Sequence, residues 1–324
     1  MHAAVFHGDK RITIGSVELP QPLAGEVLLR VNRTALCGSD IKLWIKGGKF
    51  TPGHEIFGTV EQPGHALHGR RCLVYIPVHC GHCASCLAGD TQMCLNISVL
   101  VGWNRPGGYA EYLAVPEQCL LQVPGDIEDD LAPLLLDTIG TAAHGVRFVQ
   151  ALVPPADTAP VLVTGAGPVG LGAIVALQNL GYRDVYVSDP KEERLPLAES
   201  FGAKRHPVGD TSLRIKQIVE CSGAHPPRSL GMEIVLPRGV LILVGENDNP
   251  WPVQETIGIR RKDFYMVRTF YFPKSDYPLN VELLRREKAR YRRIVDAQFG
   301  IEVLPEMFAR FAAGELVKPL LAFE

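Results

Sequence analysis

The chain has 324 residues, of which 46% are hydrophobic and 21% are charged. This is the composition of an ordinary globular protein, and the length is comfortable for two domains. The formal net charge of −2 gives no general attraction to nucleic acid or to anionic membranes, so neither is expected as a partner. The basic run over residues 285–293 is expected to be a solvated helix face, because no aromatic stacking platform accompanies it.

The N-terminal segment alternates like a strand and lacks the apolar core of a signal peptide. The apolar runs of the chain are far shorter than the ~18–20 residues that span a bilayer. A cytoplasmic location is therefore expected. In that reducing compartment, a cluster of four among the eight cysteines favours a metal site over disulfides.

The N-terminal part of the chain contains short alternating segments separated by Gly and Pro. The predicted strands cover residues 2–6, 11–19, 26–36, 57–62, 71–78 and 110–116. Strands of this length between turn signals indicate a Greek-key or barrel-like β domain. Residues 131–149 then read as helical, and residues 154–160 as a linker.

From Pro160 onward, short apolar strands alternate with helices. Strands are predicted at residues 161–163, 185–188, 215–220 and 240–245. One predicted helix ends at Leu180, and two more cover residues 191–202 and 228–236. This alternation predicts βαβ units and a parallel sheet covered on both faces. Beyond about residue 270, helices at 279–289 and 306–316 and a strand at 319–323 complete the chain.

A glycine-rich turn follows the first of these strands. Residues 165–170 read Gly-Ala-Gly-Pro-Val-Gly and fit the dinucleotide-binding pattern G-x-G-x-x-G in its proper strand–turn–helix context. Gly165 permits the tight turn, Gly167 lets the backbone approach a pyrophosphate, and Gly170 allows close helix–strand packing. Asp189 ends the second strand, where its carboxylate can accept hydrogen bonds from ribose hydroxyls and would repel a 2′-phosphate. NAD is therefore preferred over NADP.

Four cysteines occupy one loop at a spacing typical of structural zinc, namely Cys80, Cys83, Cys86 and Cys94. An iron–sulfur site is disfavoured, because the bacterial ferredoxin run has three residues before its fourth cysteine and a proline after it. Here the gap is seven residues and Leu95 follows. A closed shell of four thiolates leaves no position for substrate. His79 and His82 lie in the same loop and are expected to be bystanders.

Further motifs occur in order along nearly the whole chain: Cys37-Gly-Ser-Asp40, Gly53-His54-Glu55, GGYAEYLAVP at 107–116 and DTIGTAAHG at 137–145. With the cysteine loop, the glycine-rich turn and Asp189, they resemble the zinc-dependent medium-chain dehydrogenase/reductase family of alcohol and polyol dehydrogenases. The resemblance implies an α/β protein in two domains. Residues 1–138 and 271–324 would form a GroES-like, β-barrel-type catalytic domain, and residues 139–270 a Rossmann NAD-binding domain.

The resemblance also implies a second zinc, catalytic in role, so that each chain would hold two Zn²⁺ ions and NAD(H). Its ligands would be Cys37, His54 and Asp137, with one position left for water or substrate oxygen. Asp137 has an alternative reading as a helix-capping carboxylate. Glu55 and Asp40 match positions from which a carboxylate orients the ligands or transiently joins the metal.

Other residues match the family pattern around proton transfer and cofactor. Ser39 corresponds to the hydroxyl that carries the substrate proton outward, and Lys42 stands where many relatives have a histidine in that relay. Thr141 and Val169 correspond to residues against the nicotinamide, and Arg194 to a basic residue near the adenosine ribose. The glycine-rich turn contributes Pro168 as well.

The implied reaction is hydride transfer between NAD(H) and a secondary alcohol, polyol, sugar or cyclitol. Trp44, Ile76 and Trp103, with Lys46 and Lys49 nearby, are candidates for lining the substrate pocket. A homodimer or homotetramer is expected, with residues 264–272 as either a subunit contact or ordinary core strand. Two alternatives remain: a zinc-free quinone or enoyl reductase, and a non-catalytic NAD-sensing protein on the same fold.

Overall fold

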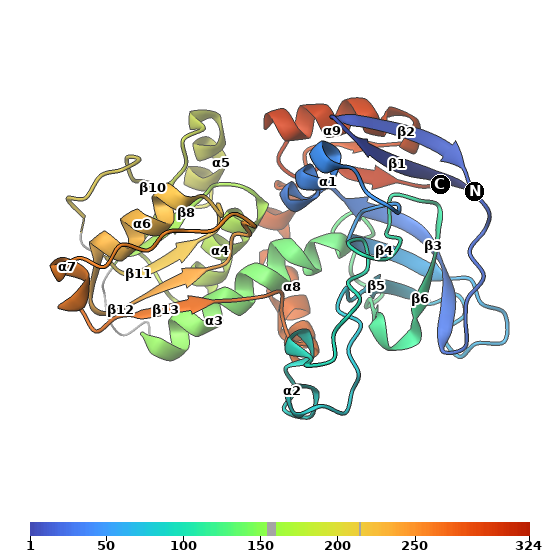
Figure 1. Cartoon of the computed structure of the whole chain (residues 1–324), viewed down its shortest axis with the longest axis horizontal. Coiled ribbons are helices and arrows are strands. Elements are labelled where there is room, and N and C mark those ends of the chain that lie inside the picture. Colours follow the sequence, from blue (N-terminus) through green and yellow to red (C-terminus); the bar gives the residue numbers. More distant parts are fainter. Residues whose placement is uncertain (154–159, 214) are drawn as a thin grey trace. The chain divides into compact units, whose positions relative to one another are not determined.

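The computed structural model describes residues 1–153, 160–213 and 215–324. It divides into two compact units (Figure 1). The first, here called the β unit, contains Met1–Leu136, Pro273–Ser275 and Tyr291–Glu324; the second, here called the αβ unit, contains Asp137–Phe272 and Asp276–Arg290. The linker predicted at residues 154–160 falls, except for Pro160, outside the described residues.

The β unit is built on strands that pair antiparallel, except for the last two, which are parallel to each other. These are β1 (His2–Gly8), β2 (Arg11–Ser16), β3 (Glu26–Ala35), β4 (Glu55–Val60), β5 (Arg71–Val74), β6 (Tyr112–Pro116), β7 (Leu120–Gln122), β14 (Gln298–Phe299) and β15 (Leu320–Ala322). β1 and β2 form a hairpin, and a second sheet has the order β14-β15-β3-β4-β5-β7, with β6 also paired to β3. Buried and less buried residues alternate along most of β3, as expected for a strand with one face on the core.

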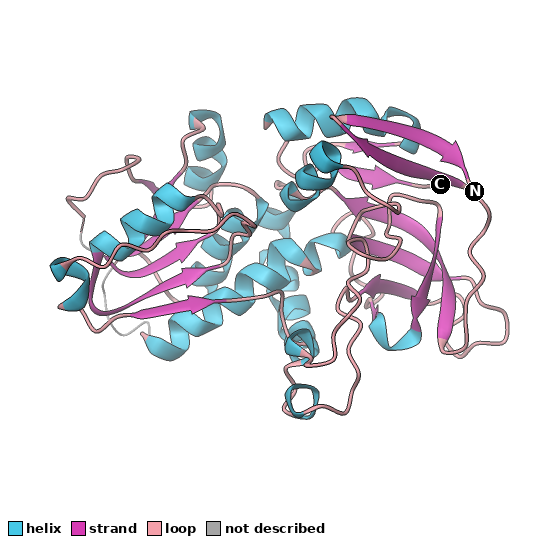
Figure 2. Ribbon diagram, viewed as in Figure 1, coloured by secondary structure: helices cyan, strands magenta, loops and turns pink. Residues whose placement is uncertain are grey.

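Short helices lie in the segments that connect these strands (Figure 2). They are η1 (Gly38–Asp40), α1 (Ile41–Lys46), α2 (Ala84–Leu87), η2 (Thr91–Met93), η3 (Glu117–Cys119), η4 (Ala132–Leu135), η8 (Ile301–Val303) and α9 (Leu304–Ala313). The helix expected at residues 306–316 is thus confirmed with an earlier start. It ends at Gly314, which adopts a left-handed conformation as a helix C-cap.

The αβ unit contains a six-stranded sheet in which every neighbouring pair is parallel. Its strands are β8 (Val161–Thr164), β9 (Val185–Ser188), β10 (Lys204–Arg205), β11 (Ile215–Glu220), β12 (Val235–Leu243) and β13 (Tyr265–Arg268), and its helices include α4 (Pro168–Asn179), α5 (Leu195–Ser200) preceded by η6 (Glu192–Arg194), α6 (His225–Ile234) and α7 (Ile257–Arg260). The order β10-β9-β8-β11-β12-β13 confirms the predicted doubly wound parallel sheet.

The prediction of one continuous helix over residues 131–149 is wrong. The segment forms η4, then a π-helical turn η5 (Asp137–Thr141), then α3 (Ala142–Leu152). Leu136 interrupts it with φ −80° and ψ −91°, outside the helical region. Likewise the helix predicted to run to residue 236 gives way to β12 at the β-branched Val235.

The basic run lies on α8 (Tyr277–Arg292), which follows the turn η7 (Lys274–Asp276). Several of its arginines are engaged within the protein: Arg285 pairs with Glu282, and Arg292 with Glu128. These intramolecular pairs agree with the interpretation as a helix face. Across the described ranges, no helix combines the length and apolarity required to cross a membrane.

Candidate metal and nucleotide sites

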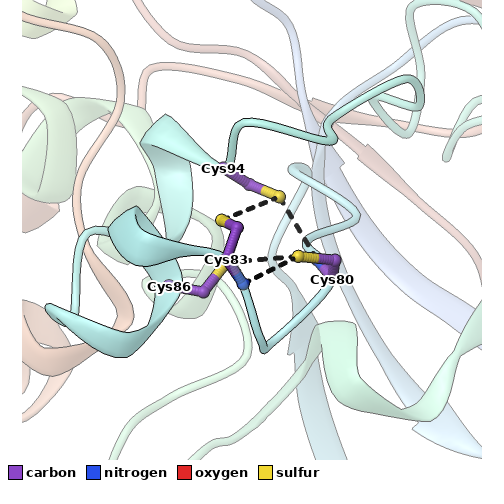
Figure 3. Close-up of side chains that lie close together, drawn as sticks. All are labelled: Cys80, Cys83, Cys86 and Cys94. Carbon is purple, nitrogen blue, oxygen red and sulfur yellow. Dashed lines mark hydrogen bonds between the residues drawn. The ribbon is translucent and has the colours of Figure 1, made fainter.

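The four cysteines of the loop after β5 converge, as Figure 3 shows. Their four sulfur atoms all lie within 4.8 Å of one another. The Sγ atoms of Cys80 and Cys86 are 4.0 Å apart and those of Cys83 and Cys94 3.9 Å apart. A tetrahedron with zinc–sulfur bonds of about 2.3 Å has sulfur–sulfur edges of about 3.8 Å, whereas a disulfide needs about 2.05 Å. The geometry fits a closed zinc shell and excludes disulfides among these four.

Backbone and side-chain donors surround the sulfurs. The N–H of Cys83 donates to Cys80 Sγ at 3.3 Å, and the Asn96 side-chain amide donates to the same sulfur at 3.4 Å. Hydrogen bonds, led by that from the His82 backbone, lower the pKa of Cys80 to about 5. Such donors stabilise the thiolate, which is the form that binds metal. The His82 ring itself turns to the carbonyl oxygen of Cys80, which agrees with its expected role as a bystander.

A second group forms where β3 ends and β4 begins. Ala35 pairs with Glu55 across the two antiparallel strands, so the residues just beyond each strand end meet. These are Cys37, in an extended conformation before η1, and His54, which precedes β4. The candidate ligand atoms of Cys37, His54 and Glu55 lie within 4.8 Å of one another. The two motifs that contain these residues therefore lie close together in the structure.

The orientation of the His54 ring follows from its neighbours. His54 Nδ1 lies 3.1 Å from Asp40 Oδ1, and both residues are buried. Against a buried carboxylate, Nδ1 carries the proton and Nε2 keeps its lone pair for a metal. Nε2 lies 3.5 Å from Ser39 Oγ, which also donates to Cys37 Sγ at 3.2 Å. Thiol, imidazole and hydroxyl thus face one another.

Two aromatic residues lie near the pair formed by His54 and Asp40. Trp103 lies against the imidazole with ring centroids 5.0 Å apart, and Lys42 Nζ lies 4.3 Å from the Trp103 ring centroid. Asp40, whose Oδ1 faces the imidazole, also accepts a hydrogen bond: the Tyr109 hydroxyl donates to its Oδ2 at 2.6 Å. Burial raises the pKa of Tyr109 well above its ordinary value, so the phenol stays protonated and donates.

Glu55 is held from the C-terminal end of the chain. Lys318, which precedes β15, donates from Nζ to Glu55 Oε1 and to the carbonyl oxygen of Leu36. Lys318 is 1% exposed and Glu55 is fully buried. The motifs could not have indicated Lys318, because it lies 263 positions from Glu55 in a segment without a recognisable pattern.

Asp137, the expected third ligand of the catalytic zinc, opens the αβ unit. Its Oδ1 accepts a hydrogen bond from Thr141 Oγ1 at 3.2 Å. Asp137 is the first and Thr141 the last residue of the π-helical turn η5. The assignment of Asp137 as a ligand stays a prediction.

The glycine-rich turn lies between β8 and α4, where the strand order reverses between β8 and β11. Ligands of doubly wound sheets bind at this position, beyond the carboxyl ends of the strands. A Cβ on Gly170 would come within 1.8 Å of the Gly165 carbonyl oxygen, whereas one on Gly167 would meet nothing within 4 Å. Close packing at Gly170 and open space at Gly167 are what a cradle for a pyrophosphate needs.

Asp189 is buried directly after β9 and anchors this turn. Its Oδ2 accepts from the Ala166 N–H at 2.7 Å and its Oδ1 from the Lys191 N–H at 2.8 Å. These two hydrogen bonds hold the carboxylate close to the glycines. Of the other predicted cofactor residues, Val169 lies in the first turn of α4 and Arg194 at the end of η6.

The chain is similar to several known dehydrogenases. Residues 23–125 match the alcohol dehydrogenase GroES-like domain. The chain is 34% identical over 235 residues to the L-threonine 3-dehydrogenase of Shewanella loihica, covering 68% of this chain and 67% of that protein. Among solved structures, it is similar to an alcohol dehydrogenase from Thermus sp. ATN1 (TM-score 0.91, 26% identity, all of both chains).

It is also similar to galactitol-1-phosphate dehydrogenase from Escherichia coli, with a TM-score of 0.88 and 25% identity over all of both chains. The predicted pairing of a GroES-like domain with a doubly wound sheet is thereby confirmed, and the chain is a dehydrogenase of the type that acts on CH–OH groups. It belongs to the zinc-dependent medium-chain dehydrogenase/reductase family.

Proposed function

We propose that the chain is a zinc- and NAD(H)-dependent dehydrogenase that interconverts a hydroxyl and a ketone on a secondary alcohol, polyol, sugar or cyclitol. The observation that carries the proposal is the convergence of the Cys37 thiol, His54 Nε2 and the Ser39 hydroxyl, with His54 Nδ1 fixed by Asp40. The Cys37 sulfur and the His54 nitrogen are ligand types that zinc prefers, and the fixed imidazole tautomer is typical of metal-ligating histidines.

The residues of the chain divide into two proposed metal sites. Cys37, His54 and Asp137 would hold the catalytic zinc, and the four cysteines of the loop, Cys80, Cys83, Cys86 and Cys94, the structural one. When bound, the catalytic zinc supplies Lewis acidity toward the substrate oxygen. Glu55, beside these ligands, would orient them or transiently join the zinc. Its pairing with Lys318 positions the carboxylate.

Ser39 is the proposed first acceptor of the substrate proton. Its hydroxyl lies between the Cys37 sulfur and His54 Nε2, within hydrogen-bond reach of a substrate oxygen at the same centre. Lys42, held against Trp103 at the same ring that covers His54, is the proposed next carrier. A lysine can serve because its neutral amine accepts a proton and the ammonium so formed releases it again.

NAD(H) would bind along the glycine-rich turn of the αβ unit. Gly165, Gly167, Pro168, Val169 and Gly170 would hold the pyrophosphate at the N-terminus of α4, and Asp189 the adenosine ribose. The proposal places Thr141 and Val169 against the nicotinamide and Arg194 near the ribose. Catalysis is assigned to residues 1–138 and 271–324, and cofactor binding to residues 139–270.

Relatives support the substrate class, since threonine and galactitol 1-phosphate, named in two of them, carry hydroxyl groups. The zinc-free reductase alternative is disfavoured, because it requires neither the cysteine loop nor Cys37 with His54. A non-catalytic NAD sensor would not require the ordered set of Ser39, Asp40 and His54. We further propose a cytoplasmic homodimer or homotetramer.

The testing experiment combines a metal count with a substrate panel. Zinc per chain is measured by atomic absorption, and polyols, sugars, cyclitols and secondary alcohols are offered with NAD while NADH absorbance is followed. Two zinc ions and turnover of at least one secondary hydroxyl are expected. A chain without zinc, or one inactive on the whole panel, would contradict the proposal.

A further inference from the structure

Tyr109 lies outside the zinc- and cofactor-binding motifs, but its hydroxyl reaches the support of the proposed catalytic metal. A continuous hydrogen-bonded chain runs from the Tyr109 hydroxyl to Asp40 Oδ2 at 2.6 Å and from Asp40 Oδ1 to His54 Nδ1 at 3.1 Å. Tyr109 and Asp40 are fully buried and His54 is 2% exposed. Each carboxylate oxygen of Asp40 therefore has one of these two groups as a donor.

We propose that Tyr109 is a positioning residue for the catalytic metal site, which fixes the Asp40 carboxylate so that Asp40 can fix the tautomer and orientation of His54. This inference rests on the proposed function. A phenol-to-carboxylate bond of 2.6 Å is short and charge-assisted, which makes it stronger than a bond between neutral groups. Without it, Oδ2 would be buried and unsatisfied, and the carboxylate would be free to turn from the imidazole.

The backbone around Tyr109 is built to hold the ring in this place. The Tyr109 N–H donates to the Pro52 carbonyl oxygen at 3.0 Å, and the Gly108 N–H donates to that of Gly53 at 2.9 Å. The segment that carries the tyrosine is thus tied to the residues just before His54. At Gly53, with φ +96°, a Cβ would come within 2.8 Å of the Tyr109 ring, so a glycine is required where the ring crosses that turn.

Aromatic packing fixes the remaining freedom of the ring. Tyr109 stacks on Phe6 with centroids 5.8 Å apart, and Phe308 meets its ring edge-on at 6.4 Å. The apolar surroundings accept the ring, while the hydroxyl is the group that requires a polar partner. Phenylalanine at this position would keep the packing and remove only the hydrogen bond to Asp40.

The test is the zinc affinity of Tyr109→Phe, measured by titrating the zinc-loaded protein with a chelator. Groups that support metal ligands typically contribute about 10- to 100-fold to affinity. We expect one zinc to be released at about tenfold lower chelator concentration, while the zinc of the four-cysteine loop is held as in the wild type. Tyr112→Phe, a partly exposed tyrosine on the adjoining β6, is the matched control and should release both ions as the wild type does.

A double-mutant cycle with Asp40→Asn tests whether Tyr109 acts through Asp40. The two substitutions should be clearly non-additive in zinc affinity, as expected for residues in one network. Unchanged zinc release in Tyr109→Phe, additive effects, or equal weakening of both zinc ions with a lower unfolding temperature would each overturn the inference. A wild-type chain that binds only one zinc would overturn the proposed function, and this inference with it.

Discussion

Lys318 and Glu55 form an ion pair in the interior of the β unit, joining the end of the chain to the residue that follows His54. The pair is almost inaccessible to solvent, and Lys318 Nζ also donates to the carbonyl oxygen of Leu36 at 3.1 Å. Each charge compensates the other in the protein interior, because burying an unpaired charge costs several kcal/mol of desolvation free energy. The pair therefore couples the stability of the β unit to the position of Glu55.

Replacing Lys318 by Met should lower the free energy of unfolding by about 3–5 kcal/mol, because it leaves the Glu55 carboxylate buried without its cation. Chemical denaturation followed by circular dichroism gives the measurement. Lys46→Met, at an exposed position of α1, is the control and should change stability little. The double variant Lys318→Met with Glu55→Gln should recover part of the loss. Equal stability of Lys318→Met and wild type would show that the pair contributes nothing.

Replacing Asp189 by Ala should raise the KM for NAD by about tenfold or more and increase the relative activity with NADP. The change removes the proposed ribose contact and two hydrogen bonds to backbone N–H groups, and a hydrogen bond to a charged group contributes about 1.5–3 kcal/mol. Steady-state kinetics with both cofactors measure the effect. Asp184→Ala, an exposed carboxylate paired with Lys204, serves as the control. Unaltered cofactor selectivity would remove the assignment of Asp189.

Replacing Cys83 by Ser should remove one zinc ion and lower the unfolding temperature while the proposed catalytic zinc remains. Structural zinc sites contribute their binding free energy to folding, so the loss should appear in thermal unfolding as well as in the metal count. The paired variant is His82→Asn, which changes the exposed histidine of the same loop and should keep both ions. If His82→Asn lost the metal and Cys83→Ser did not, the ligand assignment would be reversed.

Replacing Lys42 by Met should lower turnover and change its pH dependence, if Lys42 carries the proton beyond Ser39. A decrease of up to about 100-fold is expected, the lower end of what a proton-transferring group contributes. The measurement is a pH profile of kcat and kcat/KM, with Lys46→Met, one helical turn further along α1, as the control. A pH profile that matches the wild type would leave Lys42 with only its contact to Trp103.

The fold could be predicted from local patterns because strands and helices alternate clearly in the αβ unit, and the turn at residues 165–170 identifies its switch point. The segment 131–149 could not be predicted in detail. Its apolar residues have helical spacing, but Leu136 leaves the helical region and the chain passes from one compact unit to the other there. The short strand β7 was missed, because three residues carry almost no periodic signal.

The candidate site could be predicted only in part, for a related reason. Cys37 and His54 belong to recognisable motifs, and the β3–β4 pairing that joins them follows from two adjacent predicted strands. The partners that hold their supporting carboxylates come from distant segments. Tyr109 is 69 positions from Asp40, and Lys318 is 263 positions from Glu55. Such pairs arise from tertiary packing, which no local pattern in a single sequence records.

The most direct test of the central claim is the zinc content and turnover of a Cys37→Ser variant, measured on the same preparation and with a hydroxyl substrate that the wild type oxidises. We predict that the variant folds, retains the zinc of the four-cysteine loop, loses the second zinc and reduces NAD no faster than background. A variant that loses no zinc and turns over as fast as the wild type would contradict the proposed catalytic metal site.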